Sequence, residues 1–297
     1  MIVGRLALTP SGGLHLGNAR TFLIAWLSAR AAGGKVVLRI DDLDHGRVKP
    51  GYVEQAITDL RWLGFEWDGE PLFQSQRGAA YRAALEKLRG HVYPCVCSRR
   101  EIELALHAPH AGDEEPIYPG TCREKQHSTV RPPSWRFKVN DEVVEFDDAV
   151  HGQSRFHAIR QCGDFVIFRN DGIAAYQLAT VVDDAFQGVT EVVRGDDLLS
   201  STPRQILLYR ALGLAVPRFV HVPLVLDGAG ERMAKRRDST RLSALRDDGV
   251  EATKVIAALA ASCGWASASE RIGVEKLIQR FDLGLLPRKP VQIELRD

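Results

Sequence analysis

Near its start the chain reads Gly4-Arg5-Leu6-Ala7-Leu8-Thr9-Pro10-Ser11-Gly12-Gly13-Leu14-His15-Leu16-Gly17-Asn18. The apolar run up to Leu8 predicts a buried strand, the segment rich in Pro and Gly predicts a tight turn, and a helical pattern follows from about His15 to Ala32. A strand, a glycine-rich turn and a helix N-terminus together form an anion site, because unpaired backbone N–H groups and the helix dipole both favour negative charge there. This stretch therefore predicts an α/β fold that opens with a phosphate-binding unit.

Outward from this stretch, strand-like apolar runs alternate with helical patterns, which predicts a parallel sheet with crossover helices. The next strand is predicted at 35–40, and the next helices at 52–63 and 76–88. The alternation breaks between about His91 and Arg160, where His, Pro, Asp and Arg cluster, and it resumes at Asp164. We therefore expect the first half of a nucleotide-binding α/β domain (1–90), an insertion (91–163), the second half of that domain (164–226), and a basic loop followed by a polar helical tail (227–297).

Composition narrows the class of protein. The chain has 297 residues, of which 45% are hydrophobic and 26% charged, and this is the balance of a globular protein with a substantial core. No apolar run approaches the roughly 20 residues that a membrane-spanning helix needs, and no signal peptide is recognisable, so a cytoplasmic location is expected. The net charge of +1 neither demands nor forbids a nucleic-acid partner, which would need only a local basic patch.

A second charged segment stands far from the first, at Glu231-Arg232-Met233-Ala234-Lys235-Arg236-Arg237. It follows a predicted strand at 221–226 and a glycine-containing turn, so a mobile basic loop there could close on a triphosphate. The alternative is a solvated basic turn. For His15 the alternatives are a hydrogen bond to a phosphate or a simple helix cap, and for Gly17 they are close approach to a nucleotide or close packing.

Three of the five cysteines, Cys95, Cys97 and Cys122, fall in the insertion. In a chain without a secretion signal, such a group favours metal binding over a disulfide framework, and thiolates suit zinc, which prefers four tetrahedral ligands. The residues themselves leave the fourth ligand open among Tyr118, His107, His110 and His127. The alternative is three reduced cysteines without a metal. Cys162 and Cys263 are expected to be ordinary small core residues.

The two charged segments together resemble the two ATP-binding signatures of class I aminoacyl-tRNA synthetases. Over nearly its full length the chain is similar to their glutamyl branch, and it stops soon after the second signature, so it most resembles the short glutamyl-queuosine tRNA(Asp) synthetase family. The resemblance rests on ordered motifs: Arg5 to Asn18, Leu38 to Asp44, Cys95 to Arg99, Ile117 to Cys122, Tyr176 to Asp184, Gly188 to Gly195 and Ser201 to Gln205.

The fold that this resemblance implies is a Rossmann-like parallel sheet, split by a zinc-bearing insertion and followed by a short helical C-terminal region. The activity that it implies is attack of the glutamate α-carboxylate on the α-phosphate of ATP without tRNA, and then transfer of glutamate to the queuosine base of tRNA(Asp). The partners are ATP with Mg²⁺, L-glutamate and tRNA(Asp) carrying queuosine, with no DNA and no membrane. One structural zinc ion is implied at Cys95, Cys97, Tyr118 and Cys122.

The resemblance also implies roles for single residues. Arg5 and Arg194 bind the two carboxylates of glutamate, a task that suits guanidinium forks, although which arginine takes which carboxylate stays open. Asp41 pairs with the α-ammonium. The remaining implied contacts to glutamate are Ala7, Thr9 and Tyr176, those to ATP are Leu8, His15, Gly17, Asn18, Met233, Ala234 and Lys235, and the catalytic groups are His15 and Lys235.

Several positions depart from the family pattern. Asp41 replaces Glu, which shortens the carboxylate by one methylene and puts the contact to the ammonium in question. Asn18 replaces the second His of the first signature, and Ala234 replaces a Ser of the second. Two other functions therefore stay open: a diverged glutamyl-tRNA synthetase that charges a tRNA 3′ end, and a catalytically silent paralogue that binds nucleotide or RNA.

Overall fold

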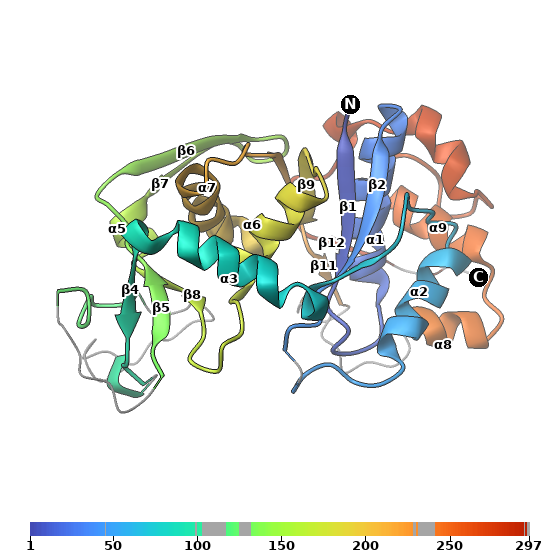
Figure 1. The fold of residues 1–297 in the computed structure, drawn as a ribbon. Helices are drawn as coiled ribbons and strands as arrows, with labels where there is room; N and C mark the ends of the chain where they lie inside the picture. Colours follow the sequence, from blue (N-terminus) through green and yellow to red (C-terminus); the bar gives the residue numbers. More distant parts are fainter. Residues whose placement is uncertain are drawn as a thin grey trace.

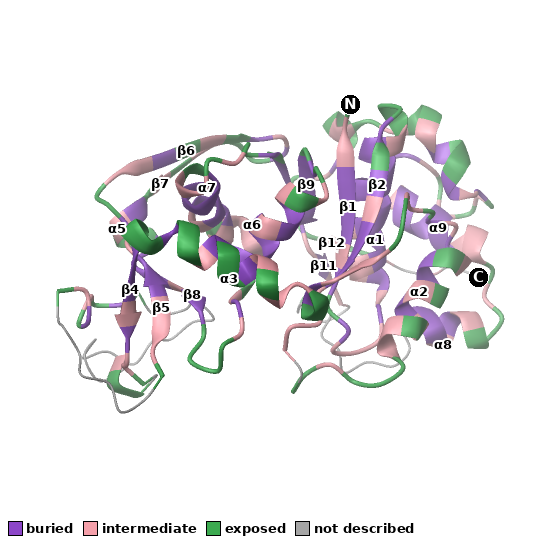
Figure 2. Ribbon diagram, viewed as in Figure 1, coloured by how far each residue is buried: buried purple, intermediate pink, exposed green. Residues whose placement is uncertain are grey.

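The computed structural model describes residues 1–44, 46–98, 100–102, 117–124, 132–227, 230, 241–293 and 295. These residues form two lobes side by side (Figure 1). One lobe contains β1 (Val3–Leu8), β2 (Lys35–Ile40) and α1 (Leu16–Ala31), and the other contains β4 (Val92–Cys95), β5 (Ser134–Phe137) and β8 (Phe165–Phe168). Each lobe has its own buried apolar cluster. The strands in the middle of the molecule are buried, and the exposed residues line the outer faces of the helices (Figure 2).

The centre of the molecule is a parallel sheet, as the alternating pattern predicts. β1 (Val3–Leu8) pairs with β2 (Lys35–Ile40), and β2 pairs with β3 (Leu72–Phe73). A second parallel set contains β9 (Glu191–Gly195) and β10 (Arg218–Val222), and β10 lies beside β6 (Val143–Asp148). β7 (Gly152–His157) closes the edge as an antiparallel hairpin with β6.

The two sets of strands meet where β1 lies beside β9. The N–H of Thr190 donates to the carbonyl of Val3 over 2.9 Å, and Arg5 Nη1 donates to the carbonyl of Val193 over 2.7 Å. Both contacts advance in the same direction along the two strands, so β1 and β9 run parallel. Their carboxyl ends therefore lie at the same edge of the sheet, which is where ligands bind in open α/β folds.

Helices cover the faces of this sheet. α1 (Leu16–Ala31) matches the predicted helix at 15–32, and Gly4 of β1 lets it pack closely, since a Cβ there would lie 3.2 Å from Ala29 Cβ. α9 (Ala252–Ala261) contributes the fully buried side chains of Val255 and Leu259, and burial of each stabilises the fold by roughly 1.5–3 kcal/mol. The other α-helices of this part are α2 (Tyr52–Trp62), α6 (Tyr176–Phe186), α7 (Thr202–Ala211), α8 (Leu242–Asp247) and α9 (Ala252–Ala261), with 3₁₀ turns at Gln74–Gln76 and Asp196–Ser201.

The second lobe contains an antiparallel sheet in the order β4 (Val92–Cys95), β5 (Ser134–Phe137) and β8 (Phe165–Phe168). α3 (Gly78–Lys87), a 3₁₀ turn at Arg89–His91 and α5 (Ala158–Gln161) complete it. The alternation that resumes at Asp164 predicts β8 as a strand of the parallel sheet, but β8 pairs antiparallel with β5 in the second lobe. Its four apolar residues have no alternation that would distinguish one sheet from the other.

The C-terminal segment differs from the expected helical tail. Val274–Arg280 and Leu283–Leu285 form 3₁₀ turns, and among the described residues after 227 only α8 (Leu242–Asp247) and α9 (Ala252–Ala261) are α-helical. Val274 and Leu277 are buried against the first core, which fixes the segment by packing rather than by helix propensity. β12 (Val291–Gln292) then pairs parallel with β11 (Val225–Leu226), the strand that leads to the basic segment. No helix among the described residues is long and apolar enough to cross a membrane.

Candidate active site

Three buried arginines lie on neighbouring strands: Arg5 in the middle of β1, and Arg39 and Arg194 near the carboxyl ends of β2 and β9. Each side chain is at most 5% exposed. A charge buried this deeply is stable only when it is paired and hydrogen-bonded. The partners of each arginine therefore show what it is available to bind.

Arg39 is fully engaged with carboxylates of the protein. Its Nε lies 2.6 Å from Asp41 Oδ1, and its Nη1 lies 2.5 Å from Asp184 Oδ1. Burial alone would lower the pKa of Arg39, but the charges of Asp41 and Asp184 outweigh it and raise that pKa well above the ordinary value. Asp41, which the family resemblance assigns to the substrate ammonium, is thus held in place by Arg39, and its side chain keeps an exposed fraction of 13%.

Arg5 is only partly engaged. Its Nη1 donates to the carbonyl of Val193, and its Nε lies 3.6 Å from Asp184 Oδ1, too far for a hydrogen bond. Among the described residues, the buried Nε of Arg5 has no hydrogen-bond partner. Burial lowers the pKa of Arg5, the charge of Asp184 opposes this shift, and the charges of Arg39 and Arg194 add to it. An incoming carboxylate would therefore be favoured beside Arg5.

Arg194 is held on three sides by neutral acceptors. Its Nε donates to His221 Nε2 over 3.0 Å, its Nη1 to Gln205 Oε1 over 2.8 Å, and its Nη2 to Thr202 Oγ1 over 2.6 Å. A guanidinium has five N–H donors, and these three bonds leave one hydrogen on each terminal nitrogen. Two N–H donors on one guanidinium suit a carboxylate, which has two acceptor oxygens. Arg194 is thus a rigid, positively charged fork without a carboxylate partner among these contacts.

The other residues expected near the amino acid lie around the end of β1. Ala7 and Leu8 are its last two residues, and the carbonyl of Leu8 accepts from the N–H of Asp41 over 2.8 Å. Thr9 follows at an exposed position. Tyr176 is the first residue of α6, is 42% exposed, and is close enough to Arg5 to affect its pKa.

The start of α1 is built around His15. His15 Nδ1 accepts from the N–H of Gly17 over 3.1 Å, and Asn18 Oδ1 accepts from the N–H of His15 over 3.2 Å, which together form a capping box. His15 therefore does cap the helix, and Asn18 holds the cap from the other side. A Cβ on Gly17 would lie 3.0 Å from His15 Cε1, so glycine is required here for the imidazole to stay where it is.

The second signature lies outside the described residues, including Met233, Ala234 and Lys235. Its flanks are described, and they lie against the first signature. The N–H of Leu242 donates to the carbonyl of Leu14 over 2.8 Å, and Arg241 forms a β-bridge with His15. The chain thus leaves and enters the second signature within reach of the N-terminus of α1.

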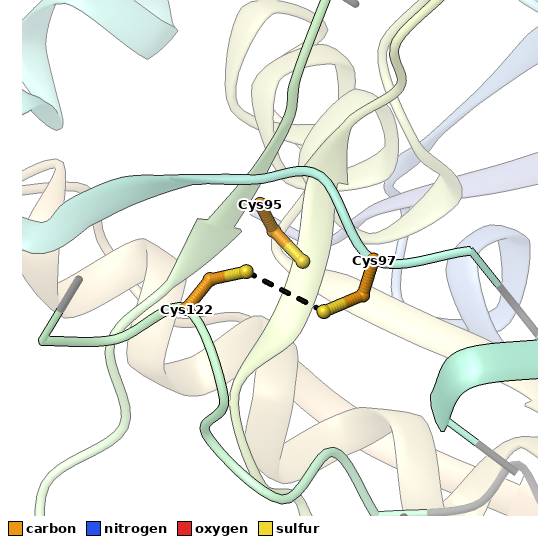
Figure 3. A group of neighbouring side chains, drawn as sticks. All are labelled: Cys95, Cys97 and Cys122. Atoms are coloured by element: carbon orange, nitrogen blue, oxygen red, sulfur yellow. Dashed lines mark hydrogen bonds between the residues drawn. The ribbon is translucent and has the colours of Figure 1, made fainter. Parts of the chain in front are cut away.

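A separate group of side chains gathers at the end of β4 (Figure 3). The sulfur atoms of Cys95, Cys97 and Cys122 all lie within 4.8 Å of one another, and the hydroxyl of Tyr118 lies 3.4 Å from the sulfurs of Cys95 and Cys97. Zn–S bonds of 2.3 Å in a tetrahedron would place two sulfurs about 3.8 Å apart, so the spacing suits such an ion. This cluster could hold a metal.

The chemistry of the cluster also suits a cation. Burial opposes ionisation of Cys122, but hydrogen bonds from Tyr118 and from the backbone lower the pKa of this thiol to about 6. Burial raises the pKa of Cys97 to about 11, and the neighbouring thiols add to this shift. His107, His110 and His127, the other ligand candidates, lie outside the described residues. Cys162 and Cys263 are buried and do not belong to the cluster.

Several residues of the site had no predicted role. Arg39 is a charged residue inside an apolar strand, and Asp184 ends an apolar run in α6. These two charges in apolar surroundings are the sequence signal from which their buried ion pair could have been predicted. Thr202 and Gln205 belong to a motif quoted for the resemblance, but nothing in the sequence connects them to Arg194. The roles of Asp148 and His221 depend on the pairing of β6 with β10, which brings together residues 73 positions apart.

The sequence of this chain is similar to known proteins over most of its length. A family model described as tRNA synthetases class I (E and Q), catalytic domain, matches residues 1–294. The chain is 49% identical to a glutamyl-Q tRNA(Asp) synthetase of Symbiobacterium thermophilum, over 99% of the chain and 96% of that relative. It is 47% identical to the protein of that name from Nitratidesulfovibrio vulgaris, over 89% of the chain and 87% of the relative.

Two solved structures of glutamate tRNA ligases have a fold similar to that of this chain. A glutamate tRNA ligase from Elizabethkingia meningosepticum, crystallised with its amino acid, superposes with a TM-score of 0.84 at 25% identity. That match covers 99% of this chain and 67% of the ligase. A glutamate-tRNA synthetase from Elizabethkingia anophelis superposes with a TM-score of 0.83 at 26% identity, over 99% of this chain and 68% of that one.

Proposed function

The chain belongs to the class I tRNA synthetases of the E and Q type and, within them, to the glutamyl-Q tRNA(Asp) synthetase family, and on this basis we propose that it attaches glutamate to the queuosine of tRNA(Asp). In the first step, ATP activates L-glutamate without tRNA. In the second step, a hydroxyl of the queuosine ring attacks the carbonyl of glutamyl-adenylate. The protein acts in the cytoplasm on tRNA, ATP and free glutamate.

The observation that carries this proposal is the pair of incompletely used arginines. Arg194 has one free hydrogen on each terminal nitrogen, and Arg5 has a buried Nε without a partner in the described part of the chain. Glutamate brings two carboxylates and one ammonium. The two arginines bind the carboxylates, and Asp41 binds the ammonium with help from Thr9 and Tyr176. Arg39 holds the carboxylate of Asp41 in an ion pair. This pair fixes where the carboxylate lies, although Asp is one methylene shorter than the Glu of the family pattern.

Activation needs the α-phosphate of ATP in line with the glutamate α-carboxylate, so positioning and charge dominate the chemistry. The N-terminus of α1 receives the phosphates, with the backbone of Ala7 and Leu8, Gly17 and Asn18 around the nucleotide. His15 stabilises charge on the α-phosphate. Met233, Ala234 and Lys235 close over ATP, with Lys235 on its phosphates, and Mg²⁺ enters as part of the ATP substrate.

The cluster in the second lobe holds zinc in this proposal, with Cys95, Cys97, Cys122 and Tyr118 as ligands. When bound, zinc supplies a structural cross-link and no reaction chemistry. It joins the end of β4 to the segment at 117–122, which has only a small apolar cluster of its own. A cross-link matters most where the apolar core is smallest.

The experiment that tests the first step is ATP–pyrophosphate exchange by the purified protein, with each amino acid in turn and no tRNA present. Exchange with glutamate alone is expected. Exchange that appears only after tRNA is added would favour a diverged glutamyl-tRNA synthetase, and no exchange under either condition would favour a silent paralogue. Preference for another amino acid would mean that Asp41 has changed the specificity.

The second step has its own test. Radiolabelled glutamate is expected to enter tRNA(Asp) that carries queuosine and not the same tRNA with guanosine at that position. Because the two tRNAs differ in only one base, their 3′ ends are identical and serve as an internal control. Equal labelling of both tRNAs would show that the acceptor is the 3′ end and would refute transfer to queuosine.

Replacement of Gly17 by Ala separates catalysis from stability. The added Cβ would lie 3.0 Å from His15 Cε1 and 3.1 Å from Nδ1, so the imidazole must move by a few tenths of an ångström. Ala is favoured over Gly in a helix interior by about 1 kcal/mol, and the displaced imidazole weakens the helix cap by a similar amount, so the melting temperature should change little. We expect kcat for exchange to fall about tenfold, because small errors in position are costly in catalysis. An unchanged kcat would argue against a role for His15 at the phosphate.

A further inference from the structure

His221 lies on β10 beneath the Arg194 fork, and nothing in the chemistry above uses it. Its side chain is fully buried. Its Nδ1 lies 2.7 Å from Asp148 Oδ2, and its Nε2 lies 3.0 Å from both Arg194 Nε and Thr202 Oγ1. We propose that His221, oriented by Asp148, is a positioning residue that fixes the Arg194 fork for a carboxylate of the substrate. This inference rests on the proposed function and assigns that function a further residue.

The contacts determine which nitrogen of His221 carries the proton. Arg194 Nε can only donate, so His221 Nε2 must accept. Asp148 is an acceptor, and its Oδ2 also accepts from the backbone N–H of His221 over 3.0 Å, so Nδ1 must donate to it. Thr202 receives a hydrogen bond from Arg194 Nη2, and its hydroxyl proton can share the lone pair of Nε2 with Arg194 Nε. Every polar contact of the ring is therefore satisfied only in the neutral form with the proton on Nδ1.

This arrangement explains how the fork can be both charged and rigid. A carboxylate of the protein at this place would neutralise Arg194 and compete with the substrate. A neutral imidazole accepts from Nε without cancelling the charge. With Nε, Nη1 and Nη2 each bound to one acceptor, the guanidinium plane cannot rotate, so the two remaining N–H groups keep fixed orientations. Less orientational freedom is then lost when the substrate binds.

The charges around the ring favour the neutral form. The groups that face it are Asp148 at the end of β6, Arg194 on β9 and His151 in the turn after β6. Burial lowers the pKa of His221, its hydrogen bond to Asp148 opposes this, and Arg194 and His151 lower it further. A second proton on Nε2 would also face the N–H of Arg194 directly, with two donors in contact. The geometry and the electrostatics thus select the same state.

Two replacements of His221 distinguish positioning from simple packing. In His221→Gln, the side-chain oxygen can take the place of Nε2 and accept from Arg194. In His221→Asn, the amide can take the place of Nδ1 and donate to Asp148, but nothing accepts from Arg194. Both variants are polar, smaller than His and unable to titrate, so each serves as the control for the other. His157→Asn, at an exposed histidine on β7, controls for the substitution itself.

The readouts are KM for glutamate, KM for ATP and kcat in ATP–pyrophosphate exchange, with the melting temperature of each variant. We expect His221→Asn to raise KM for glutamate about 10- to 100-fold, which corresponds to loss of a hydrogen bond to a charged group. His221→Gln should raise it by no more than about threefold, and KM for ATP should stay within about twofold in both. Equal losses in the two variants, or parallel losses in both KM values, would refute the positioning role.

A second pair of variants, at Thr202, tests the inference if His221→Asn does not fold. Thr202→Val removes the hydroxyl between Arg194 and His221, and Thr202→Ser keeps it. Only the valine variant should raise KM for glutamate. Failure of this inference differs from failure of the proposed function, because in the first case the wild-type protein still exchanges pyrophosphate with glutamate, and in the second case it does not.

Discussion

Replacement of Arg194 by Ala is expected to lower kcat/KM for glutamate in ATP–pyrophosphate exchange by about 10³-fold, because a buried charge partner of the substrate is worth roughly 4 kcal/mol. The variant should keep its fold, since Arg194 packs among polar partners rather than in the apolar core. Loss of activity together with a native circular dichroism spectrum is therefore the expected combination. Wild-type turnover would remove Arg194 from the glutamate site.

Two further variants make this result interpretable. Arg194→Lys keeps the charge and loses the planar fork, so it should recover only a small part of the activity if bidentate geometry matters. Arg218→Ala removes an arginine from the amino end of β10, where it pairs with Glu191, and should leave exchange unchanged. A loss of activity in Arg218→Ala as large as in Arg194→Ala would point to a general effect on the sheet.

The second large effect concerns the cysteine cluster. Cys122→Ser is expected to lower the zinc content from one ion per chain to less than about a tenth, because structural zinc sites release about 10–16 kcal/mol on binding and depend on every ligand. The segment at 117–124 should then become accessible to protease. Glutamate activation without tRNA should change by less than about twofold, since β4 lies in the lobe away from β1 (Figure 1).

The measurement is metal content by atomic emission, alongside limited proteolysis and exchange. Cys162→Ser is the matched control, because Cys162 is also a buried free cysteine but lies outside the cluster. It should keep its zinc. A wild-type protein that contains no zinc after growth in zinc-supplemented medium would contradict the metal assignment. A Cys122→Ser variant that loses zinc and also loses tRNA-independent exchange would contradict its purely structural role.

Much of the fold was predictable because local patterns matched the structure. The strand, turn and helix at the start of the chain, and the helices at 52–62 and 78–87, follow from apolar periodicity and from Gly and Pro positions. The pairing of β8 and the form of the last segment were not predictable in this way. A run of four apolar residues fits either sheet, and 3₁₀ turns depend on packing against α1 rather than on local propensity.

The site shows the same division. The cysteine group was visible from spacing, whereas only the family resemblance selected Tyr118 among the four candidates for the fourth ligand, because a tyrosine near cysteines has no spacing rule of its own. Arg5 and Arg194 likewise depended on the resemblance. Asp148 and His221 were invisible because their contact requires β6 and β10 to be neighbours, and strand order cannot be read from the composition of either strand. Long-range register is thus what the sequence left undetermined.

The neighbours β1 and β9 also constrain how this protein is made. Val3 and Thr190, which join the two halves of the central sheet, are 187 residues apart in the chain. At a synthesis rate of 5–20 residues per second, about 10–40 s pass between the emergence of β1 and that of β9 from the ribosome. During this time β1 has β2 on one side and an unpaired edge on the other, and such an edge invites aggregation. Arg5 bonds to Val193, beside Arg194, only when that edge closes. The newly made chain therefore completes the proposed substrate site late in folding and depends until then on whatever shields β1.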